Sequence, residues 1–453
     1  MQFELTKEFI TQLEEIIELQ DKNSASQLIG ELHSADIAEI YNELNIEQAK
    51  FLYLLLDKEK AADVLAELEE DDRERFLKAL PSEVIAKQFI EEMDSDDAAD
   101  VLADLSEEKK QEVLSLIDAI EQAGDIVDLL NYDEDSAGGL MAKEYIAVNS
   151  NWDVTRCIDE IRHQAEDVDE IYNVYVIDDD NILIGVLPLK QLLISHSKKK
   201  IANITSDDII SLKVDTPAED VAIIMQKYDL VAAPVIDDLG RLLGKITFDD
   251  IVDFIRDEAD KDYQLISGIT EDVEASDKVW QLTRARIPWL LIGLIGGILG
   301  ALVITNYEDM ISEYAGLAMF LPLIAAMGGN VGVQSSSIVV QGLANKTLGL
   351  ESTGKKLLKE LGVAIIAGIV CSSLMFAFNF FFFSDSMALT ATVSIALFSA
   401  IIFASMFGTF VPLALNHFKI DPALATGPFI TTINDIMGIS LYLLIASLVF
   451  NIF

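Results

Sequence analysis

One aspartate in an apolar segment is the residue of this 453-residue chain whose type and position most clearly indicate chemistry. Asp435 lies in DPALATGPFITTINDIMGISLYLL, and no apolar segment of the C-terminal third contains Lys or Arg to neutralise it. A carboxylate in hydrocarbon is costly unless it faces a partner or a water-filled path. We therefore interpret Asp435 as part of a cation pathway, and the alternative is a carboxylate that is protonated or bonded to a neighbouring helix.

A second polar motif supplies uncharged oxygen atoms. The segment LPLIAAMGGNVGVQSSSIVVQGLA contains glycines that allow close helix approach and side chains that carry oxygen. A site built only from oxygen suits a hard cation such as Mg²⁺. Asp421 is expected to open the last apolar segment, which would place Asp435 fourteen residues and roughly 21 Å deeper. The candidate pathway residues are Asp435, Asn330, Gly328, Gly329, Asp421 and Thr431.

Five apolar segments must position these side chains. A bilayer core requires roughly 20 residues of helix, and the sequence offers about 287–305, 315–343, 361–383, 388–416 and 422–450. The N-terminus has no basic flank or cleavage site typical of a signal peptide. Lys and Arg gather before the first segment and between the second and third, which indicates that these connections face inward. We expect a multi-pass plasma-membrane protein with a cytoplasmic N-terminus and, because five is odd, an external C-terminus.

Charge divides the chain at residue 287. Residues 1–286 hold 68 Asp and Glu against 27 Lys and Arg, whereas residues 287–453 hold 8 against 5. The net charge of −44 is therefore located almost entirely before the membrane segments. Such a charge repels phosphate and excludes a nucleic-acid partner. Cys157 and Cys371 support neither a disulfide framework nor a zinc site.

Two internal repeats organise the acidic part. The segment 176–193, VIDDDNILIGVLPLKQLL, aligns with 235–252, VIDDLGRLLGKITFDDIV, at a constant offset of 59 residues. Each copy predicts a strand, a turn, a strand and a helix, and the pair resembles a tandem CBS module. Further upstream, AADVLAEL at 61–68 recurs as AADVLADL at 98–105, and the helical spacing of apolar residues predicts a stack of short helices.

The order of these parts resembles the MgtE magnesium channel family. The resemblance rests on the acidic helices, the CBS pair, an acidic connector, and the motifs RARIPWLL, GGNVGVQSS and DPALATGPFITTINDIMG. It implies a homodimer in membrane lipid, five spans per subunit, Asp435 as the pore carboxylate and a cytoplasmic Mg²⁺ sensor. CBS pairs in the family can also bind ATP, and nothing in this sequence decides that question.

The predicted fold is a multidomain membrane protein with four kinds of part. These are an all-α acidic N-terminal domain, an α/β tandem CBS pair, a plug-like connecting helix and a five-helix transmembrane domain. The expected boundaries are 1–130 for the N-terminal domain, 131–200 for the first CBS copy and 201–258 for the second. The connecting helix is expected at 259–286 and the membrane domain at 287–453.

The function implied is a Mg²⁺-selective channel that imports Mg²⁺ down its gradient and is shut by Mg²⁺ bound to the acidic domains. The alternatives are a transporter of another divalent ion such as Co²⁺ or Ni²⁺, and a membrane Mg²⁺ sensor that does not transport. An enzyme is not indicated, because the spans contain no catalytic constellation. The candidate regulatory residues, by their positions in the resembling motifs, are Asp94, Asp97, Glu219, Asp229, Asp250, Asp253, Glu258 and Asp262.

Overall fold

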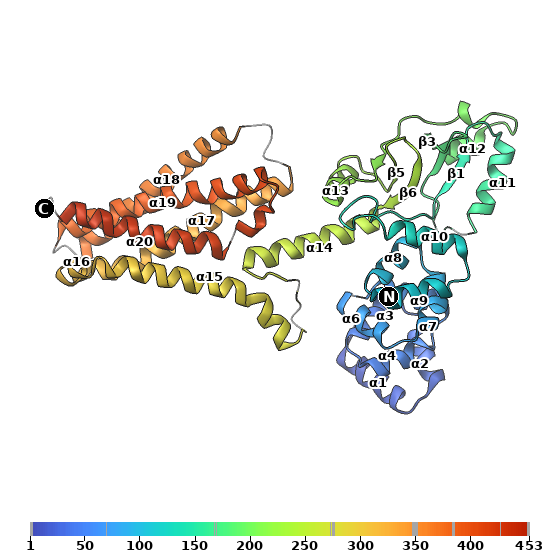
Figure 1. Ribbon diagram of the computed structural model, residues 1–453, viewed down its shortest axis with the longest axis horizontal. Coiled ribbons are helices and arrows are strands. Elements are labelled where there is room, and N and C mark those ends of the chain that lie inside the picture. The colour runs from blue at the N-terminus through green and yellow to red at the C-terminus, as the bar shows by residue number, and fades with distance from the viewer. Residues whose placement is uncertain are drawn as a thin grey trace. The chain divides into compact units, whose positions relative to one another are not determined.

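The computed structural model divides into two compact units, Met1–Ile255 and Arg256–Phe453, which are described separately below. The residues that it describes are 3–68, 70–166, 168, 170–271, 273, 277–346, 352–382, 386–425 and 427–450. Figure 1 shows the elements of each unit.

The first unit begins with ten short α-helices, as the sequence predicts. Polar side chains start many of them: Asn45 caps one helix through a capping box, and Asp57 accepts a hydrogen bond from the backbone N–H of Lys60 at 3.0 Å. Buried apolar residues from most of these helices form a shared core. The helices are α1 Lys7–Glu18, α2 Lys22–Ile29, α3 Ser34–Asn42, α4 Ile46–Tyr53, α5 Lys58–Ala66, α6 Glu70–Lys78, α7 Ser82–Gln88, α8 Ser95–Ala103, α9 Glu107–Leu116 and α10 Ile120–Leu129, with a 3₁₀ turn η1 at Ile90–Glu92.

Two three-stranded sheets follow, one for each copy of the 59-residue repeat. In both sheets the middle strand pairs with one parallel and one antiparallel neighbour, in the orders β1-β2-β3 and β4-β5-β6. The elements of the first copy are β1 Ile146–Asn149, α11 Val154–Gln164, β2 Val174–Ile177, β3 Leu183–Leu187, α12 Leu189–Ile194 and the 3₁₀ turn η2 Ile201–Asn203. Those of the second are β4 Leu212–Lys213, α13 Ala218–Lys227, β5 Ala232–Ile236, β6 Leu242–Thr247 and α14 Phe248–Ser267.

The two copies are joined by a reciprocal pair of backbone hydrogen bonds. The N–H of Leu183 donates to the carbonyl of Gly240 at 2.9 Å, and the N–H of Leu242 donates to the carbonyl of Asn181 at 3.0 Å. Leu242 and Gly240 each lie 59 residues after their counterparts. This exchange between equivalent positions is what a two-fold relation between the copies produces, and it agrees with the expected CBS pair.

Helix α14 leads from the second copy into the second unit. It runs unbroken from Phe248 to Ser267, so the expected domain boundary between residues 258 and 259 falls inside it. The connecting segment expected at 259–286 comprises the end of α14, an irregular stretch and the first residues of α15. Gly268, with a φ of +82°, follows the end of α14 in the left-handed region that glycine tolerates.

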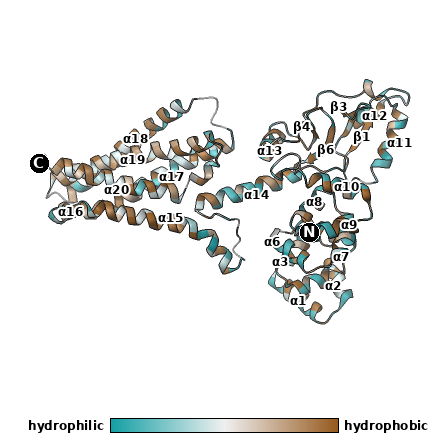
Figure 2. Ribbon diagram, viewed as in Figure 1, coloured by the Kyte–Doolittle hydropathy of each residue, from teal (hydrophilic) through white to brown (hydrophobic). Residues whose placement is uncertain are grey.

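Within its described residues, the second unit contains five helices that are long and apolar enough to cross a membrane. Figure 2 shows that hydrophobic residues dominate these helices. Helix α19 packs against α17, α18 and α20, whereas α15 packs mainly against α20. The elements are α15 Val279–Thr305, α16 Glu308–Glu313, the 3₁₀ segment η3 Ala315–Phe320, α17 Leu321–Ala344, α18 Thr353–Phe382, α19 Met387–His417, the 3₁₀ turn η4 Pro422–Ala425 and α20 Pro428–Phe450.

The expected start of the fifth span is wrong. Asp421 precedes only the short turn η4, and Gly427, with a φ of +52°, separates that turn from α20. Pro428 then opens α20, which is where proline suits a helix because its missing N–H has no partner there. Asp435 therefore lies seven residues into its helix, about 10 Å from the helix start, rather than at the end of a continuous 21 Å helical rise from Asp421.

Candidate cation sites

The membrane unit contains a cavity of about 990 Å³ whose wall includes Asp435. The wall combines the glycine-rich face of α15, formed by Gly293, Gly296, Gly297 and Gly300, with the start of α20. Gly293 and Gly297 have open space where a Cβ would stand. The small residues of α15 therefore leave room beside the carboxylate.

Thr431 and Gly329 belong to the immediate surroundings of Asp435. Thr431 lines the cavity, and its hydroxyl donates to the carbonyl of Gly427 at 2.9 Å. A Cβ on Gly329 would lie 3.5 Å from Oδ1 of Asp435 and 3.0 Å from Cγ2 of Thr431. Gly328 faces Asn434, since its Cβ would lie 3.3 Å from the carbonyl oxygen of that residue. The structure thus brings four of the six candidate pathway residues to the contact of α17 with α20.

The other two pathway candidates lie elsewhere. Asn330 is exposed and does not line the cavity. Asp421 is also exposed, and its Oδ1 accepts a hydrogen bond from the backbone N–H of Ala423 at 2.8 Å. In this chain Asp421 therefore stabilises the turn before α20.

The cavity mouth includes the junction between α14 and α20. Ser267 and Gly268 line the cavity together with Arg286 and Trp289. A Cβ on Gly268 would lie 2.6 Å from Cγ of Pro428, and a Cβ on Gly427 would lie 2.2 Å from the carbonyl oxygen of Ile266. The two left-handed glycines thus let the end of α14 contact the start of the helix that carries Asp435.

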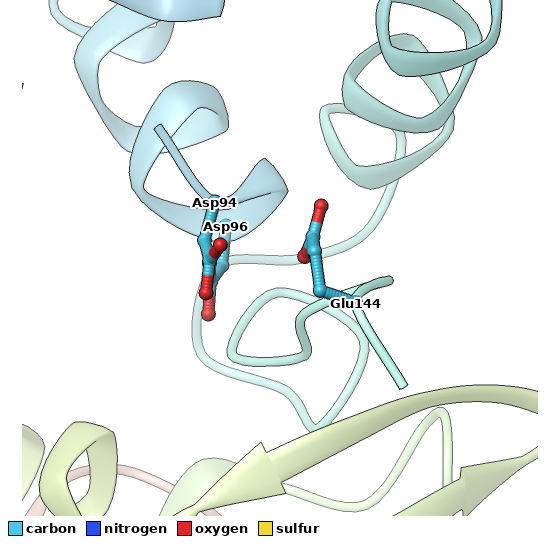
Figure 3. A group of neighbouring side chains, drawn as sticks. All are labelled: Asp94, Asp96 and Glu144. Carbon is cyan, nitrogen blue, oxygen red and sulfur yellow. The ribbon is translucent and has the colours of Figure 1, made fainter. Parts of the chain in front are cut away.

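The first unit contains a group of carboxylates at the start of α8. Ligand oxygens of Asp94, Asp96 and Glu144 lie within 4.8 Å of one another, which is close enough for one metal ion (Figure 3). Asp97 and Asp100 on α8 and Asp250 on α14 interact electrostatically with the same group. We call these six residues, Asp94, Asp96, Asp97, Asp100, Glu144 and Asp250, the acidic cluster.

Local hydrogen bonds hold two members of the acidic cluster in place. Oε1 of Glu144 accepts from the backbone N–H of Ser95 at 3.1 Å, and Oε2 accepts from the Ser95 hydroxyl at 2.8 Å. Oδ2 of Asp250 accepts from the backbone N–H and the hydroxyl of Thr247, at 3.1 and 2.5 Å. Glu144 therefore ties the first CBS copy to α8. Asp250, in the first turn of α14, accepts from Thr247 just before that helix and so fixes the helix start, as the third residue of a capping box does.

Four members of the acidic cluster, Asp96, Asp97, Asp100 and Asp250, have pKa values raised above the usual range of aspartate. Loss of water and then repulsion from Asp97 and Asp250 raise the pKa of Asp96 well above its usual range. Loss of water followed by repulsion from Asp100 and Asp250 raises the pKa of Asp97 to about 7. Loss of water raises the pKa of Asp100 to about 6, although nearby Arg73 acts in the opposite direction. A divalent cation would relieve this repulsion.

Three of the eight predicted regulatory residues, Asp94, Asp97 and Asp250, lie in the acidic cluster. Asp253 is close enough to Glu67 to help raise the pKa of that residue, although burial is the larger cause. Glu219 and Asp229 are exposed near the two ends of α13 and do not belong to the cluster. Glu258 and Asp262 lie one turn apart on α14 in the second unit.

Sequence reasoning missed three members of the acidic cluster. Asp96 and Asp100 lie four residues apart, a spacing that puts both on one face of α8 and that could have revealed them. Glu144 is isolated in the sequence and gave no signal. It joins the cluster only because the loop before β1 packs against α8.

Comparisons with known proteins agree with this architecture. Residues 321–445 match the MgtE family described as a divalent cation transporter, residues 32–135 match the MgtE intracellular N domain, and residues 137–196 and 201–257 match the CBS domain. The expected CBS pair and helical N-terminal domain are thus confirmed.

Curated relatives match over nearly the whole chain. The magnesium transporter MgtE of Enterococcus faecalis is 33% identical and covers 99% of both chains. That of Thermus thermophilus is 30% identical and covers 96% of this chain and 97% of its own. A solved cytosolic domain, described as that of the Mg²⁺ channel MgtE in complex with ATP, is 33% identical with a TM-score of 0.51 and covers 54% of this chain and 99% of its own.

These matches and the five apolar helices identify a multi-pass membrane protein of a transporter family rather than an enzyme. The resemblance first indicated by the GGN and NDIMG motifs is confirmed over the whole length. The chain belongs to the MgtE family of magnesium transporters.

Proposed function

We propose that this protein is a Mg²⁺ channel that imports Mg²⁺ down its electrochemical gradient and is shut by Mg²⁺ bound to its cytoplasmic acidic cluster. The observation that carries the proposal is the position of Asp435 in the wall of a 990 Å³ cavity between membrane helices. The names of the relatives, which are magnesium transporters, support Mg²⁺ as the ion.

Asp435 would act as the attractive group of the pathway. The family resemblance supports a homodimer. Such a homodimer would place two of these carboxylates on a shared axis, where a divalent cation relieves their repulsion. Mg²⁺ loses its water reluctantly, so passage of a largely hydrated ion fits a cavity that offers one carboxylate and Thr431. The membrane potential contributes about 4.6 kcal/mol for two charges at 100 mV.

The acidic cluster would act as the sensor. It contains six carboxylates, and the pKa values of Asp96, Asp97 and Asp100 are raised, first by loss of water and then by repulsion from neighbouring carboxylates. Mg²⁺ bound among them would stabilise the arrangement in which α8 and α14 are held together. Each ion shifts the gate only by its preference for that arrangement, so several ions would give a steep response.

We assign the remaining regulatory and pathway roles from the family resemblance alone. Asp253, Glu258, Asp262, Glu219 and Asp229 are proposed as further sensor residues on the family resemblance, and Asn330 and Asp421 likewise as pathway residues. The positive residues between α17 and α18 support a cytoplasmic position for that connection and for the N-terminus. The ATP complex of a similar cytosolic domain supports ATP as a ligand of this CBS pair.

The test is Mg²⁺ flux into liposomes that contain the purified protein. We expect influx that depends on an inward gradient and falls when Mg²⁺ is present on the cytoplasmic side. If added Co²⁺ or Ni²⁺ reduces the Mg²⁺ influx more strongly than the same concentration of additional unlabelled Mg²⁺ does, the protein is a transporter of that other divalent ion. Absence of any ion-dependent flux would leave the sensor alternative in its place.

A further inference from the structure

A carboxylate outside the Asp435 cavity joins three membrane helices. Glu360 on α18 accepts at Oε1 from the hydroxyl of Ser335 on α17, at 2.7 Å, and from the hydroxyl of Ser405 on α19. The two hydroxyl oxygens are 3.1 Å apart. Both serines are buried, and Glu360 is half-buried. Three oxygen atoms from three helices thus meet at one point.

The charge of Glu360 has no protein counter-charge in the part of the chain that the structure describes. No Lys, Arg or His there forms an ion pair with Glu360, and the adjacent Lys359 is exposed. A half-buried carboxylate without a cation is costly in a membrane domain. An ion from solution would supply the missing charge.

The three oxygens form one hydrogen-bonded group that is rich in lone pairs. Each serine has a single hydroxyl hydrogen, which it can donate to Oε1 of Glu360 or to the other serine. The group therefore has two hydroxyl hydrogens for three oxygen atoms, and its remaining lone pairs attract a cation.

The spacing of the oxygens suits a small hard ion. Mg²⁺ binds oxygen at about 2.1 Å in octahedral geometry, so neighbouring ligands lie about 3.0 Å apart. Two of the three separations, 2.7 Å between Ser335 and Glu360 and 3.1 Å between the two serines, lie on either side of this value, and the contact of Ser405 with Glu360 is shorter. Three protein oxygens would occupy one face of the octahedron, and water would occupy the other three positions.

Two buried polar side chains lie on neighbouring turns of the same helices. Thr409 lies one turn after Ser405 on α19 and is 2% exposed, and its hydroxyl has no hydrogen-bond partner among the described residues. The side chain of Asn434, 1% exposed, likewise has none there, and it lies beside Gly332, one turn before Ser335. Donors and acceptors without a protein partner among the described residues are thus present within one turn of both serines.

Glu360 and Asp435 lie beside different levels of α17. Gly329 faces Asp435, whereas Ser335, which donates to Glu360, lies six residues or about 9 Å further along that helix. The two carboxylates also have different surroundings, because Glu360, Ser335 and Ser405 do not line the Asp435 cavity.

We propose that Glu360, Ser335 and Ser405 form a second cation site of the membrane domain, which binds a partly hydrated divalent metal separately from the Asp435 cavity. The site rests on the proposed function only for the identity of its natural ion, Mg²⁺. This metal position lies outside the Asp435 cavity, which is the proposed pore.

The experiment is anomalous diffraction from crystals of the full-length protein soaked in Mn²⁺, a spectroscopically visible substitute for Mg²⁺. We expect a peak within about 2.5 Å of Oε1 of Glu360, together with a peak at Asp94, Asp96 and Glu144. In Glu360→Gln the first peak should vanish and the second should stay. Glu313→Gln, which removes a carboxylate from α16, should retain both.

Two results would overturn the site. One is a wild-type crystal with Mn²⁺ at the acidic cluster and none at Glu360, and the other is a Glu360 peak that survives in Glu360→Gln. If that variant does not fold, Ser405→Ala keeps the carboxylate and should weaken the peak. Asp435→Asn should leave the Glu360 peak unchanged, so failure of the proposed pore and failure of this site are separate outcomes.

Discussion

The membrane cavity and the acidic cluster, two of our proposed cation sites, both present carboxylates, but they differ in how many they bring together. The cavity wall contains one acidic residue, Asp435, beside glycines and threonines. The acidic cluster combines six carboxylates from α8, α14 and the loop before β1. A pathway needs a single attractive point that an ion can leave, whereas a sensor needs several groups whose repulsion disappears only when ions are bound. The contrast predicts that single changes matter in the cavity and that combined changes matter in the cluster.

The largest effect is expected from Asp435→Asn. Among the described residues that line the cavity, Asp435 carries the negative charge and Arg286 the positive one. If a desolvated cation pairs with Asp435, removing the carboxylate costs about 3 kcal/mol or more. Mg²⁺ flux in liposomes should therefore fall at least about 100-fold. Flux within a factor of two of the wild type would show that the pathway does not depend on this carboxylate. It would refute the expectation that a single change in the cavity is enough to stop flux.

The next effect concerns gating. Replacing Asp94, Asp97 and Asp250 together with Asn removes half of the acidic cluster and should leave maximal flux intact. Coupling energies between regulatory and functional sites are typically 1–3 kcal/mol, so the cytoplasmic Mg²⁺ concentration that halves the flux should rise by about tenfold. The measurement is flux as a function of Mg²⁺ on the cytoplasmic side.

The matched control is Asp207→Asn, Asp208→Asn and Asp220→Asn, which removes the same number of charges from the CBS pair. These carboxylates lie outside the acidic cluster, so the inhibitory concentration should stay within a factor of two. An equal shift in both triple variants would mean that overall charge, rather than the cluster, sets the response.

A smaller effect is expected from pH. The pKa of Asp97 is raised to about 7, so this carboxylate is mostly protonated at pH 6 and mostly ionised at pH 8. Its raised pKa means that the assembled cluster without metal becomes less stable as the pH rises through 7. Mg²⁺ binds only the ionised form, so inhibition should require several-fold less Mg²⁺ at pH 8 than at pH 6. In Asp97→Asn the pH dependence should shrink, and an unchanged dependence would assign the titration to other groups.

The smallest effect is expected from Asp421→Asn. The side chain is exposed and accepts a hydrogen bond from Ala423, which an asparagine oxygen can also accept. Flux should change by less than about twofold. A loss comparable with that of Asp435→Asn would show that the pathway includes Asp421, as the sequence alone suggested. The pathway would then contain two carboxylates, Asp421 and Asp435, rather than one.

The sequence predicted the parts of the molecule better than their contacts. Both repeats were found because identical residues recur at offsets of 59 and 37, and these offsets reappear in the paired sheets and in helices α5 and α8. Asp435 was found because a charge is conspicuous in an apolar segment. The membrane helices were found because their length and hydropathy are sufficient signals.

The contacts that were missed depend on tertiary packing. Glu144 joins Asp94 and Asp96 across 48 residues or more of chain, and no spacing rule connects them. Glu360 lies one residue outside the expected third span, at 361–383, so its approach to Ser335 and Ser405 had no sequence signal. The depth of Asp435 was misjudged because Gly427 interrupts the helix, and a glycine in an apolar segment does not by itself reveal a positive φ.

The helix starts at Asp57 and Asp94 are equivalent positions of the repeat with different surroundings. Both precede helices of nine residues and stand 37 positions apart. Asp57 caps its helix, whereas the side chain of Asp94 makes no cap hydrogen bond, and Glu144 instead accepts from the first N–H of that helix. Loss of a cap costs about 1 kcal/mol. A carboxylate from the CBS pair therefore supplies at α8 the acceptor that α5 finds in its own preceding residue, and the stability of α8 depends on a contact between two domains.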